Sequence, residues 1–267
     1  MKARALLVAA SLSFVALPAH AQDVNARDSW SGGRARPFVS TTIDFGFLYM
    51  RPRATFGWGR PFSTWFGVEL NPIFVSTGVG AYGGLRAAFP FFDVRVGARG
   101  FYAFDHGYLV NQSNYAEVDL NTNSTGNAVA VTYETEVRGV VRAGPGDLGL
   151  LASLSTVTNV PAGMSVYEET LHVIVRPPVV WRMRLGYSFF VATGIGRFSI
   201  TPVVEVLGNP SRDAFVVRAG ILASYLINKH LEVRGTFVPM VAGPDSIGIL
   251  GSDFTELGLR YRWASGD

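Results

Sequence analysis

The sequence predicts an all-β chain that forms a transmembrane antiparallel up-and-down β-barrel of 10–12 strands, with twelve preferred. Of its 267 residues, 48% are hydrophobic and 13% aromatic while only 16% are charged, a composition too apolar for a disordered chain. After about the first 20 residues, no apolar run reaches the roughly 18 residues that a membrane helix needs. From residue 36 onward, apolar and polar residues instead alternate with a period of two, as in β-strands.

The first 21 residues have the features of a secretory signal peptide. Lys2 and Arg4 precede a short apolar stretch, and Ala19-His20-Ala21 fits the small-x-small cleavage rule. Removal of the two basic residues lowers the formal net charge from +3 to about +1. The basic isoelectric point therefore does not indicate nucleic-acid binding, and no basic tract supports it. The absence of cysteine excludes disulfides, thiolate zinc sites and cysteine nucleophiles.

The alternation is clearest between residues 92 and 104. Phe92, Val94 and Val96 lie on one face of the expected strand, and Asp93, Arg95 and Arg99 lie on the other. The same alternation predicts eleven strand segments, at 36–50, 62–74, 77–88, 91–106, 128–142, 147–158, 166–188, 189–207, 213–228, 230–243 and 252–263.

Eleven is an odd number, and single-chain bacterial barrels have an even number of strands. Merging 62–88 gives ten strands, and reading 115–120 as a further strand gives twelve. Twelve is preferred, because a merged strand would greatly exceed the roughly 9–11 residues that cross a membrane. A split of 166–188 at Pro177-Pro178 is rejected, because it would move 107–127 to the side of the short turns.

Both counts place the same connections on each side of the membrane. Segments 51–61, 159–166, 207–212 and 243–252 are expected as outer loops. The turns at Gly144-Pro145-Gly146-Asp147 and Asn228-Lys229-His230 are expected on the inner side. Short turns on one side and longer loops on the other are typical of transmembrane barrels.

The polarity of the two faces favours a membrane barrel over a soluble lipocalin or sandwich. A soluble barrel needs many Lys and Glu residues on its outer face, but the only lysines here are Lys2 and Lys229. The apolar face also carries aromatics near strand ends, which suit a lipid interface. Tyr49, Tyr102 and Trp263 are examples. The apolar face is therefore expected to face lipid and the charged face to line the lumen.

The closing segment Thr255-Glu-Leu-Gly-Leu-Arg-Tyr-Arg-Trp263 resembles the aromatic-ended last strand of Gram-negative outer-membrane β-barrel proteins, although Ala264-Ser-Gly-Asp267 follows the aromatic residue. The resemblance implies location in the cell outer membrane, contact with membrane lipid and lipopolysaccharide, and insertion by the barrel assembly machinery. The oligomeric state stays open. The expected organisation is a signal peptide at 1–21, a short periplasmic extension at 22–35, the barrel at 36–263 and a tail at 264–267.

Charged residues dominate the expected inner face, and arginines outnumber carboxylates. Burial of so much charge requires pairing, so cross-strand ion pairs that fill the barrel are the preferred interpretation. The charged ladder most clearly placed by alternation comprises Arg95, Arg99, Glu134, Glu136, Arg138, Arg142, Arg182, Arg184, Glu232, Arg234, Glu256, Arg260 and Arg262. Arg86, Arg176, Arg218, Asp44, Glu69, Asp93 and Glu205 extend it.

The preferred function is a non-enzymatic barrel with a structural or surface-interaction role. A narrow channel weakly biased toward anions is the first alternative, since the inner face has a basic surplus. The long loop carries the candidates for surface contact, which are Asp105, His106, Asn111, Asn114, Asp119, Asn121 and Asn123.

The third hypothesis is a hydrolase that acts on envelope lipid and depends on His106. Adjacent strand residues point to opposite faces, so Asp105 is not expected to orient this histidine. Oxygen-bearing residues alternate from Asp119, but Ser124 and Ala130 stand where a calcium-binding loop needs glycine and glutamate. No catalytic residue, cofactor or metal site is therefore expected.

Overall fold

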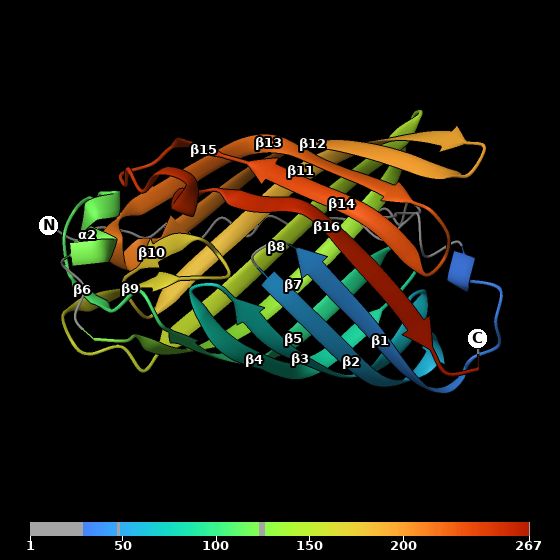
Figure 1. Ribbon diagram of the computed structural model, residues 1–267, viewed down its shortest axis with the longest axis horizontal. Helices are drawn as coiled ribbons and strands as arrows, with labels where there is room; N and C mark the ends of the chain where they lie inside the picture. The colour runs from blue at the N-terminus through green and yellow to red at the C-terminus, as the bar shows by residue number, and fades with distance from the viewer. Residues whose placement is uncertain (1–28, 47–48, 123–125, 267) are drawn as a thin grey trace, which may run out of the picture.

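The computed structural model describes residues 29–46, 49–122 and 126–266, and within them a closed antiparallel barrel of twelve strands (Figure 1). The expected signal peptide lies outside the described residues. The fold class predicted from the alternation is confirmed. The barrel strands are β1 Arg36–Gly46, β2 Tyr49–Arg60, β3 Thr64–Val75, β4 Gly78–Ala88, β5 Phe92–Ala103, β7 Val129–Ala143, β8 Gly146–Thr158, β11 Val179–Thr193, β12 Gly196–Asn209, β13 Ala214–Leu226, β14 Leu231–Val238 with β15 Met240–Ala242, and β16 Asp253–Ala264.

The barrel closes where the first and last strands pair. Ser40 to Phe45 of β1 lie opposite Ala264 to Leu259 of β16. Beyond the last strand, the Ser265 N–H donates to the Val39 carbonyl, and Arg36 donates to the Ser265 and Gly266 carbonyls at 2.8 and 2.7 Å. These bonds extend the β1–β16 seam past the end of the ladder.

The twelfth strand is β2, in a segment expected as an outer loop. Its outward positions include Phe56 and Trp58, and its inward positions include Arg51, Arg53 and Thr55. Pro52 and the glycines at 57 and 59 weaken the strand pattern in the sequence. All of these positions nevertheless have partners in the pairing of β2 with β1. The expectation of a loop at 51–61 was therefore wrong.

Two other expected strands differ in the structure. Residues 115–120 form no barrel strand, because Glu117–Thr122 is the short helix α2, and Asp119 accepts a hydrogen bond from the Ala116 N–H just before it. The segment 166–188 is divided among β9 Met164–Glu168, β10 Val173–Val175 and the start of β11. The rejected break at Pro177-Pro178 thus exists, but the preceding half does not cross the barrel. The merger of 62–88 is also wrong, since a turn at 76–77 separates β3 from β4.

The two ends of the barrel differ in their connections. One end, here called the turn end, has the short connections at 61–63, 89–91, 144–145, 194–195 and 227–230. The start of β1 and the end of β16 lie there as well. The other end, here called the loop end, has the connections at 104–128, 159–178, 210–213 and 243–252. Among these, 159–178 and 243–252 contain the segments expected as loops.

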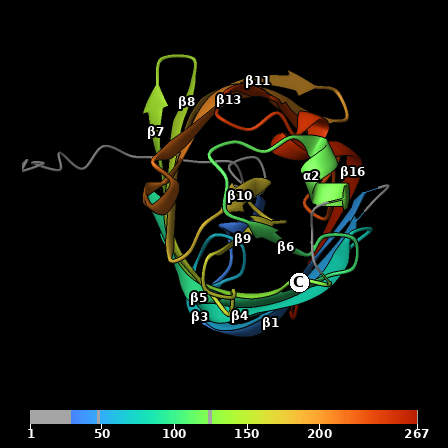
Figure 2. The ribbon, with the colours of Figure 1, turned by 90° about the vertical axis from the view of Figure 1, so that its left-hand side faces the viewer.

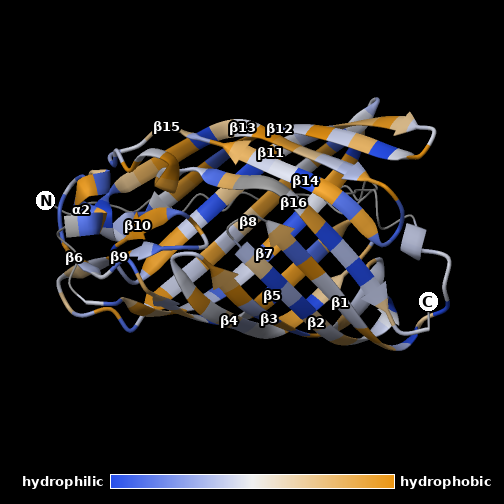
Figure 3. Ribbon diagram, in the orientation of Figure 1, coloured by the Kyte–Doolittle hydropathy of each residue, from blue (hydrophilic) through white to orange (hydrophobic). Residues whose placement is uncertain are grey.

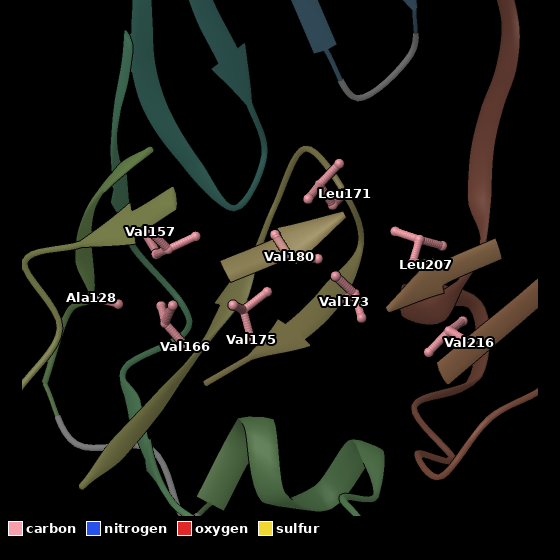
Figure 4. Close-up of a cluster of buried hydrophobic side chains, with 10 residues drawn as sticks. Ala128, Val157, Val166, Leu171, Val173, Val175, Val180, Leu207 and Val216 are labelled. Atoms are coloured by element: carbon pink, nitrogen blue, oxygen red, sulfur yellow. The ribbon is translucent and has the colours of Figure 1, made fainter. Parts of the chain in front are cut away.

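The long connections at the loop end fold into the barrel mouth, where they form the plug. Within the plug, β6 Tyr108–Val110, β9 and β10 make a three-stranded antiparallel sheet beside α2 (Figure 2). Val166, Val173 and Val175 of this sheet pack against Val180 and Leu207 of the barrel wall (Figure 4). A second cluster joins Leu109, Tyr115, Leu120, Tyr167, Ile174 and Ile247.

Each buried aliphatic side chain of this kind contributes about 1.5–3 kcal/mol. The plug therefore has an apolar core of its own, continuous with the barrel wall.

Hydrophilic and hydrophobic residues alternate along many of the strands (Figure 3). Large apolar residues on the outer face are exposed, for example Leu85 at 64% and Leu154 at 55%. Acidic and basic residues of the same strands are buried inside, including Glu69, Arg99 and Glu205. Among the described residues, no helix is long and apolar enough to span a membrane.

Candidate functional site in the barrel lumen

One side of the lumen carries a continuous network of ion pairs that begins at Glu69 on β3. This carboxylate is fully buried and accepts a hydrogen bond from Arg86 at 3.0 Å. The guanidinium groups of Arg53 and Arg95 lie 3.6 and 3.8 Å from its other oxygen. Arg86 also contacts Asp93 at 2.7 Å. Glu69 lies opposite Gly84 on β4, and the buried Tyr82 side chain occupies the space over this glycine.

The network continues onto β5, β7 and β11. Glu134 accepts from Arg95 at 2.6 Å and from Arg99 at 2.7 Å. Glu136 pairs with Arg138 at 2.7 Å and with Arg182 at 2.8 Å. The network of Glu69, Arg86, Asp93, Arg95, Arg99, Glu134, Glu136, Arg138 and Arg182 is here called the paired wall.

A second group of buried charges lies closer to the loop end. Glu205 on β12 contacts Arg184 at 2.6 Å and Arg218 at 2.8 Å. Arg184 also contacts Asp253 on β16. Glu205 and Arg218 are almost completely buried, so each needs the other to offset its desolvation.

The opposite side of the lumen, formed by β2, β1, β16 and β14, is here called the seam wall. Arg260 donates two hydrogen bonds to Asp44, at 2.5 and 3.0 Å, and Arg262 pairs with Glu232 at 2.5 Å. Arg51 and Arg234 differ from them. Neither has a carboxylate within 4.0 Å in the part of the chain that the structure describes.

The two walls enclose a cavity of about 210 Å³ beneath the plug. Nine arginines and four carboxylates line it, so its wall has a clear cationic surplus. Thr170 reaches it from the plug. The lining arginines are Arg51, Arg53, Arg95, Arg99, Arg138, Arg182, Arg184, Arg234 and Arg260, and the carboxylates are Asp44, Glu134, Glu136 and Asp253.

Charged groups attach the plug to the barrel. Glu168, at the end of β9, accepts from Arg99 at 2.7 Å and also from the backbone N–H groups of Thr170 and Leu171. Arg218 donates to the carbonyls of Leu171 and His172 at 2.8 and 2.7 Å. The β9–β10 hairpin is thus bound at its tip to Arg99 of the paired wall and to Arg218 of the second charged group.

Two further plug contacts involve Arg212 and Tyr167. Arg212 forms a bidentate pair with Asp245, at 2.8 and 2.7 Å, and donates to the Ile174 carbonyl. The Tyr167 hydroxyl donates to the Leu250 carbonyl at 2.7 Å and lies 3.1 Å from His172 Nδ1. Burial lowers the pKa of His172 and raises that of Tyr167 well above its usual range.

His106 is buried in the plug rather than exposed on a surface loop. Its Nδ1 lies 3.0 Å from Glu169 Oε1, and Thr77 donates to the other oxygen of Glu169 at 3.0 Å. Asp105 is exposed and does not take this position. A hydrolytic role for His106 stays a prediction.

The remaining loop candidates occupy different environments. Asn114 and Asn121 are exposed, and Asn111 is half-buried, with its side-chain oxygen accepting from Ser165 at 2.7 Å. Asp119 caps the start of α2. Asn123 lies outside the described residues, as does the side chain of Glu256. Among the described residues, no group of three or more His, Asp and Glu side chains could hold a metal ion.

Most residues of the expected charged ladder line the lumen, and Arg142 is the exception. Its side chain is 57% exposed at the turn end, 3.4 Å from Asp147. Sequence reasoning missed Arg51, Arg53, Asp253, Glu168 and Glu169. Arg51 and Arg53 alternate with Met50 and Pro52, a signal that the proline and the neighbouring glycines obscured. Glu168 and Glu169 carry no signal for their position, since no periodicity distinguishes a plug hairpin from a spanning strand.

The outer face of the barrel indicates which medium surrounds the protein. A closed sheet with an apolar, aromatic-rich outer face and an ion-paired interior is stable only where lipid covers the outside. The protein is an outer-membrane β-barrel. The orientation expected from the sequence, with the turn end toward the periplasm and the loop end outside, stays a prediction. Tyr49, expected at the lipid interface, instead lines the lumen.

Comparison with known proteins adds little beyond this architecture. No protein-family model matches the barrel, and no curated protein matches it in sequence. Among solved structures, the KdgM porin in complex with disordered oligogalacturonate has a TM-score of 0.42 and 9% identity, over 84% of this chain and 98% of that chain. The NanC porin has a TM-score of 0.35 and 10% identity, over 86% and 98%. A loop-deletion mutant of OmpT from Vibrio cholerae has a TM-score of 0.37 and 9% identity, over 85% and 97%.

Proposed function

We propose that this barrel is an anion-selective channel whose outer mouth is closed by the plug in the present conformation. The observation that carries the proposal is the composition of the cavity wall, in which nine arginines face four carboxylates. Arginine guanidinium groups keep their charge at any physiological pH. A pore lined by a surplus of such groups attracts anions and repels cations.

The shape of the lumen supports the same proposal. Low-dielectric walls focus the field of the unpaired guanidinium groups into the cavity and raise the local anion concentration. The plug-forming loops all belong to the loop end, while the described turn-end connections are short. Control of passage would therefore lie at the outer mouth, where Glu168 and Arg218 fasten the β9–β10 hairpin.

A structural or surface-interaction barrel is the rival, and it was the function preferred from the sequence. The paired wall and the apolar core of the plug support it, because ion pairs and packed side chains fill much of the interior. Asp105, Asn114 and Asn121 are exposed at the loop end and would suit surface contacts. A structural or surface-interaction role does not require a surplus of arginines around a cavity, whereas an anion-selective channel does.

Planar-bilayer recording of the refolded protein distinguishes the two functions. The wild-type barrel should open rarely, and a variant in which residues 164–175 are replaced by a short Gly-Ser turn should conduct steadily. Under a potassium chloride gradient, the reversal potential should show preference for chloride. Heat-modifiable gel migration confirms that the shortened barrel has folded.

Glu168→Gln is a second variant expected to open the channel, because it removes the ion pair with Arg99. Unlike the shortened barrel, this variant keeps the full length of the plug. A folded, shortened barrel that is silent, or that prefers potassium, would contradict the channel proposal. Silence of both variants would favour the structural role.

A further inference from the structure

We infer that Arg51 and Arg234 form a binding site for the oxyanion group of a small solute, a carboxylate or a phosphate, within the lumen. The inference deepens the proposed channel function and rests on it for the passage of the solute. The two side chains extend from β2 and β14 on either side of the β1–β16 seam and line the same cavity.

These two arginines differ from the other guanidinium groups of the lumen in their partners. In the described chain, neither has a hydrogen bond to a carboxylate or a carboxylate oxygen within 4.0 Å. The Nε of Arg51 is also buried without a hydrogen-bond partner, a feature it shares with Arg53, Arg95, Arg99 and Arg182. A buried N–H group without a partner costs about 1–3 kcal/mol, a cost that a bound oxyanion would remove.

The neighbouring carboxylates are already occupied by other arginines. Asp44, which lies opposite Arg51 in the β1–β2 register, accepts two hydrogen bonds from Arg260. Asp253 is paired with Arg184. Among the described residues, Arg51 and Arg234 therefore have no carboxylate of their own within 4.0 Å, and they are available to a solute that enters the cavity.

Tyr49 holds Arg51 in place without neutralising it. The Arg51 guanidinium lies over the Tyr49 ring, 5.3 Å from its centroid. A cation held by an aromatic face keeps its full charge and its free N–H groups. Tyr49 is thus a positioning residue for the site.

Two glycines make room for this arrangement. The Tyr49 ring covers Gly46, its partner in the β1–β2 register, and a Cβ atom at Gly46 would overlap the ring. On β16, Gly258 is the partner of Arg234. It lies one residue beyond the pair of Leu259 with Phe45, and is therefore next to Gly46 across the seam. In this row of the described wall, Gly46 and Gly258 carry no side chains between Tyr49 and Arg234, and the Tyr49 ring occupies the space over Gly46.

The size and charge of the site select the class of ligand. A cavity of about 210 Å³ admits a compact organic acid or a phosphate rather than a polymer segment. Planar guanidinium groups bind carboxylate and phosphate oxygens in bidentate geometry, whereas chloride offers no such pair of acceptors. Oxyanions should therefore bind more tightly than halides.

Isothermal titration calorimetry of the refolded protein in detergent tests the site, with sodium phosphate and sodium succinate as probes against a sodium chloride background. Saturable binding of at least one probe is expected, and the tighter probe identifies the oxyanion type. Arg51→Gln and Arg234→Gln should each weaken binding about tenfold or more, since a charge-assisted hydrogen bond has roughly this effect. Tyr49→Phe should keep the affinity, while Tyr49→Leu should lower it.

Arg142→Gln is the matched control, because it removes the same charge from the turn end, and its affinity should equal that of the wild type. Heat-modifiable migration verifies that every variant is folded. Absence of saturable binding, or equal affinities in the Arg51, Arg234 and Arg142 variants, would overturn the site. If the variants lose binding but the barrel never conducts, the site stands and the channel proposal fails. Chloride-selective conductance with unchanged binding in the arginine variants would refute only the site.

Discussion

The paired wall and the seam wall line the same lumen with different charge arrangements. On the paired wall, each of the four carboxylates contacts at least one arginine within 3.0 Å. On the seam wall, Arg51 and Arg234 have no carboxylate partner among the described residues. Matched charge offsets the cost of burial and builds a rigid wall. Unmatched buried charge has no such compensation within the wall, and a bound anion would supply it.

Removal of a central carboxylate from the paired wall should have the largest effect on stability. Glu69→Gln leaves Arg53, Arg86 and Arg95 around a neutral side chain. Loss of one partner in a buried network costs roughly 3–5 kcal/mol. Urea unfolding of the refolded barrel, followed by tryptophan fluorescence, measures the difference, and Arg142→Gln should change stability by less than about 0.5 kcal/mol. A cost below about 1 kcal/mol for Glu69→Gln would show that the wall is not held by its pairing.

The attachment of the plug to the paired wall should show the next largest effect. Glu168→Gln removes the ion pair with Arg99, and hydrogen bonds to charged groups contribute about 1.5–3 kcal/mol. The frequency of channel opening in planar bilayers should therefore rise about tenfold or more. Glu117→Gln, on the exposed side of α2, removes the same charge without touching a wall. Equal opening frequencies in the two variants would mean that Glu168 does not hold the plug closed.

The seam wall should respond in selectivity rather than in stability. The double variant Arg51→Gln and Arg234→Gln removes two unpaired charges and breaks no ion pair. Loss of the Arg51–Tyr49 contact and removal of a buried N–H group without a partner oppose each other, so its free energy of unfolding should change by less than about 2 kcal/mol. The reversal potential of an opened barrel under a salt gradient should move toward zero. A large loss of stability would show that these arginines have partners that hold the fold.

The smallest expected effect is a dependence of plug closure on pH. Burial lowers the pKa of His172, so the closed plug holds this histidine neutral while a solvated hairpin takes up a proton. Stability from this source is complete above the ordinary histidine pKa of about 6.5 and decreases as the pH falls below it. Tyr167, Arg218 and Asp253 surround the group.

Opening should therefore be more frequent at pH 5 than at pH 7.5, as measured in symmetric salt. His172→Gln should reduce the difference between the two pH values, since glutamine does not titrate in this range. An unchanged pH response in that variant would assign the effect to another group.

Alternation in the sequence identified the inward face of most spanning strands, but it did not identify the ion-pair partners. It placed Arg95 and Glu134 on the charged face, while the β5–β7 register puts Glu136 directly opposite Arg95. The observed 2.6 Å contact of Arg95 is nevertheless with Glu134, because long side chains reach diagonal neighbours across a sheet. Arg51 was missed altogether, since Pro52 and two glycines gave its strand the composition of a loop.

The sequence by itself determined a β-barrel with an apolar exterior and a charged interior. A period of two fixes which side chains share a face, whatever the partner strand. Only the tertiary structure decided that 49–60 crosses the barrel while 115–122 and 164–175 fill its mouth, because the same alternation suits a spanning strand and an inner sheet. Closure of the ring, with β1 against β16, also decided which arginines find carboxylates. Among the described residues, Arg51 and Arg234 face the cavity without one, since pairing depends on register and not on composition.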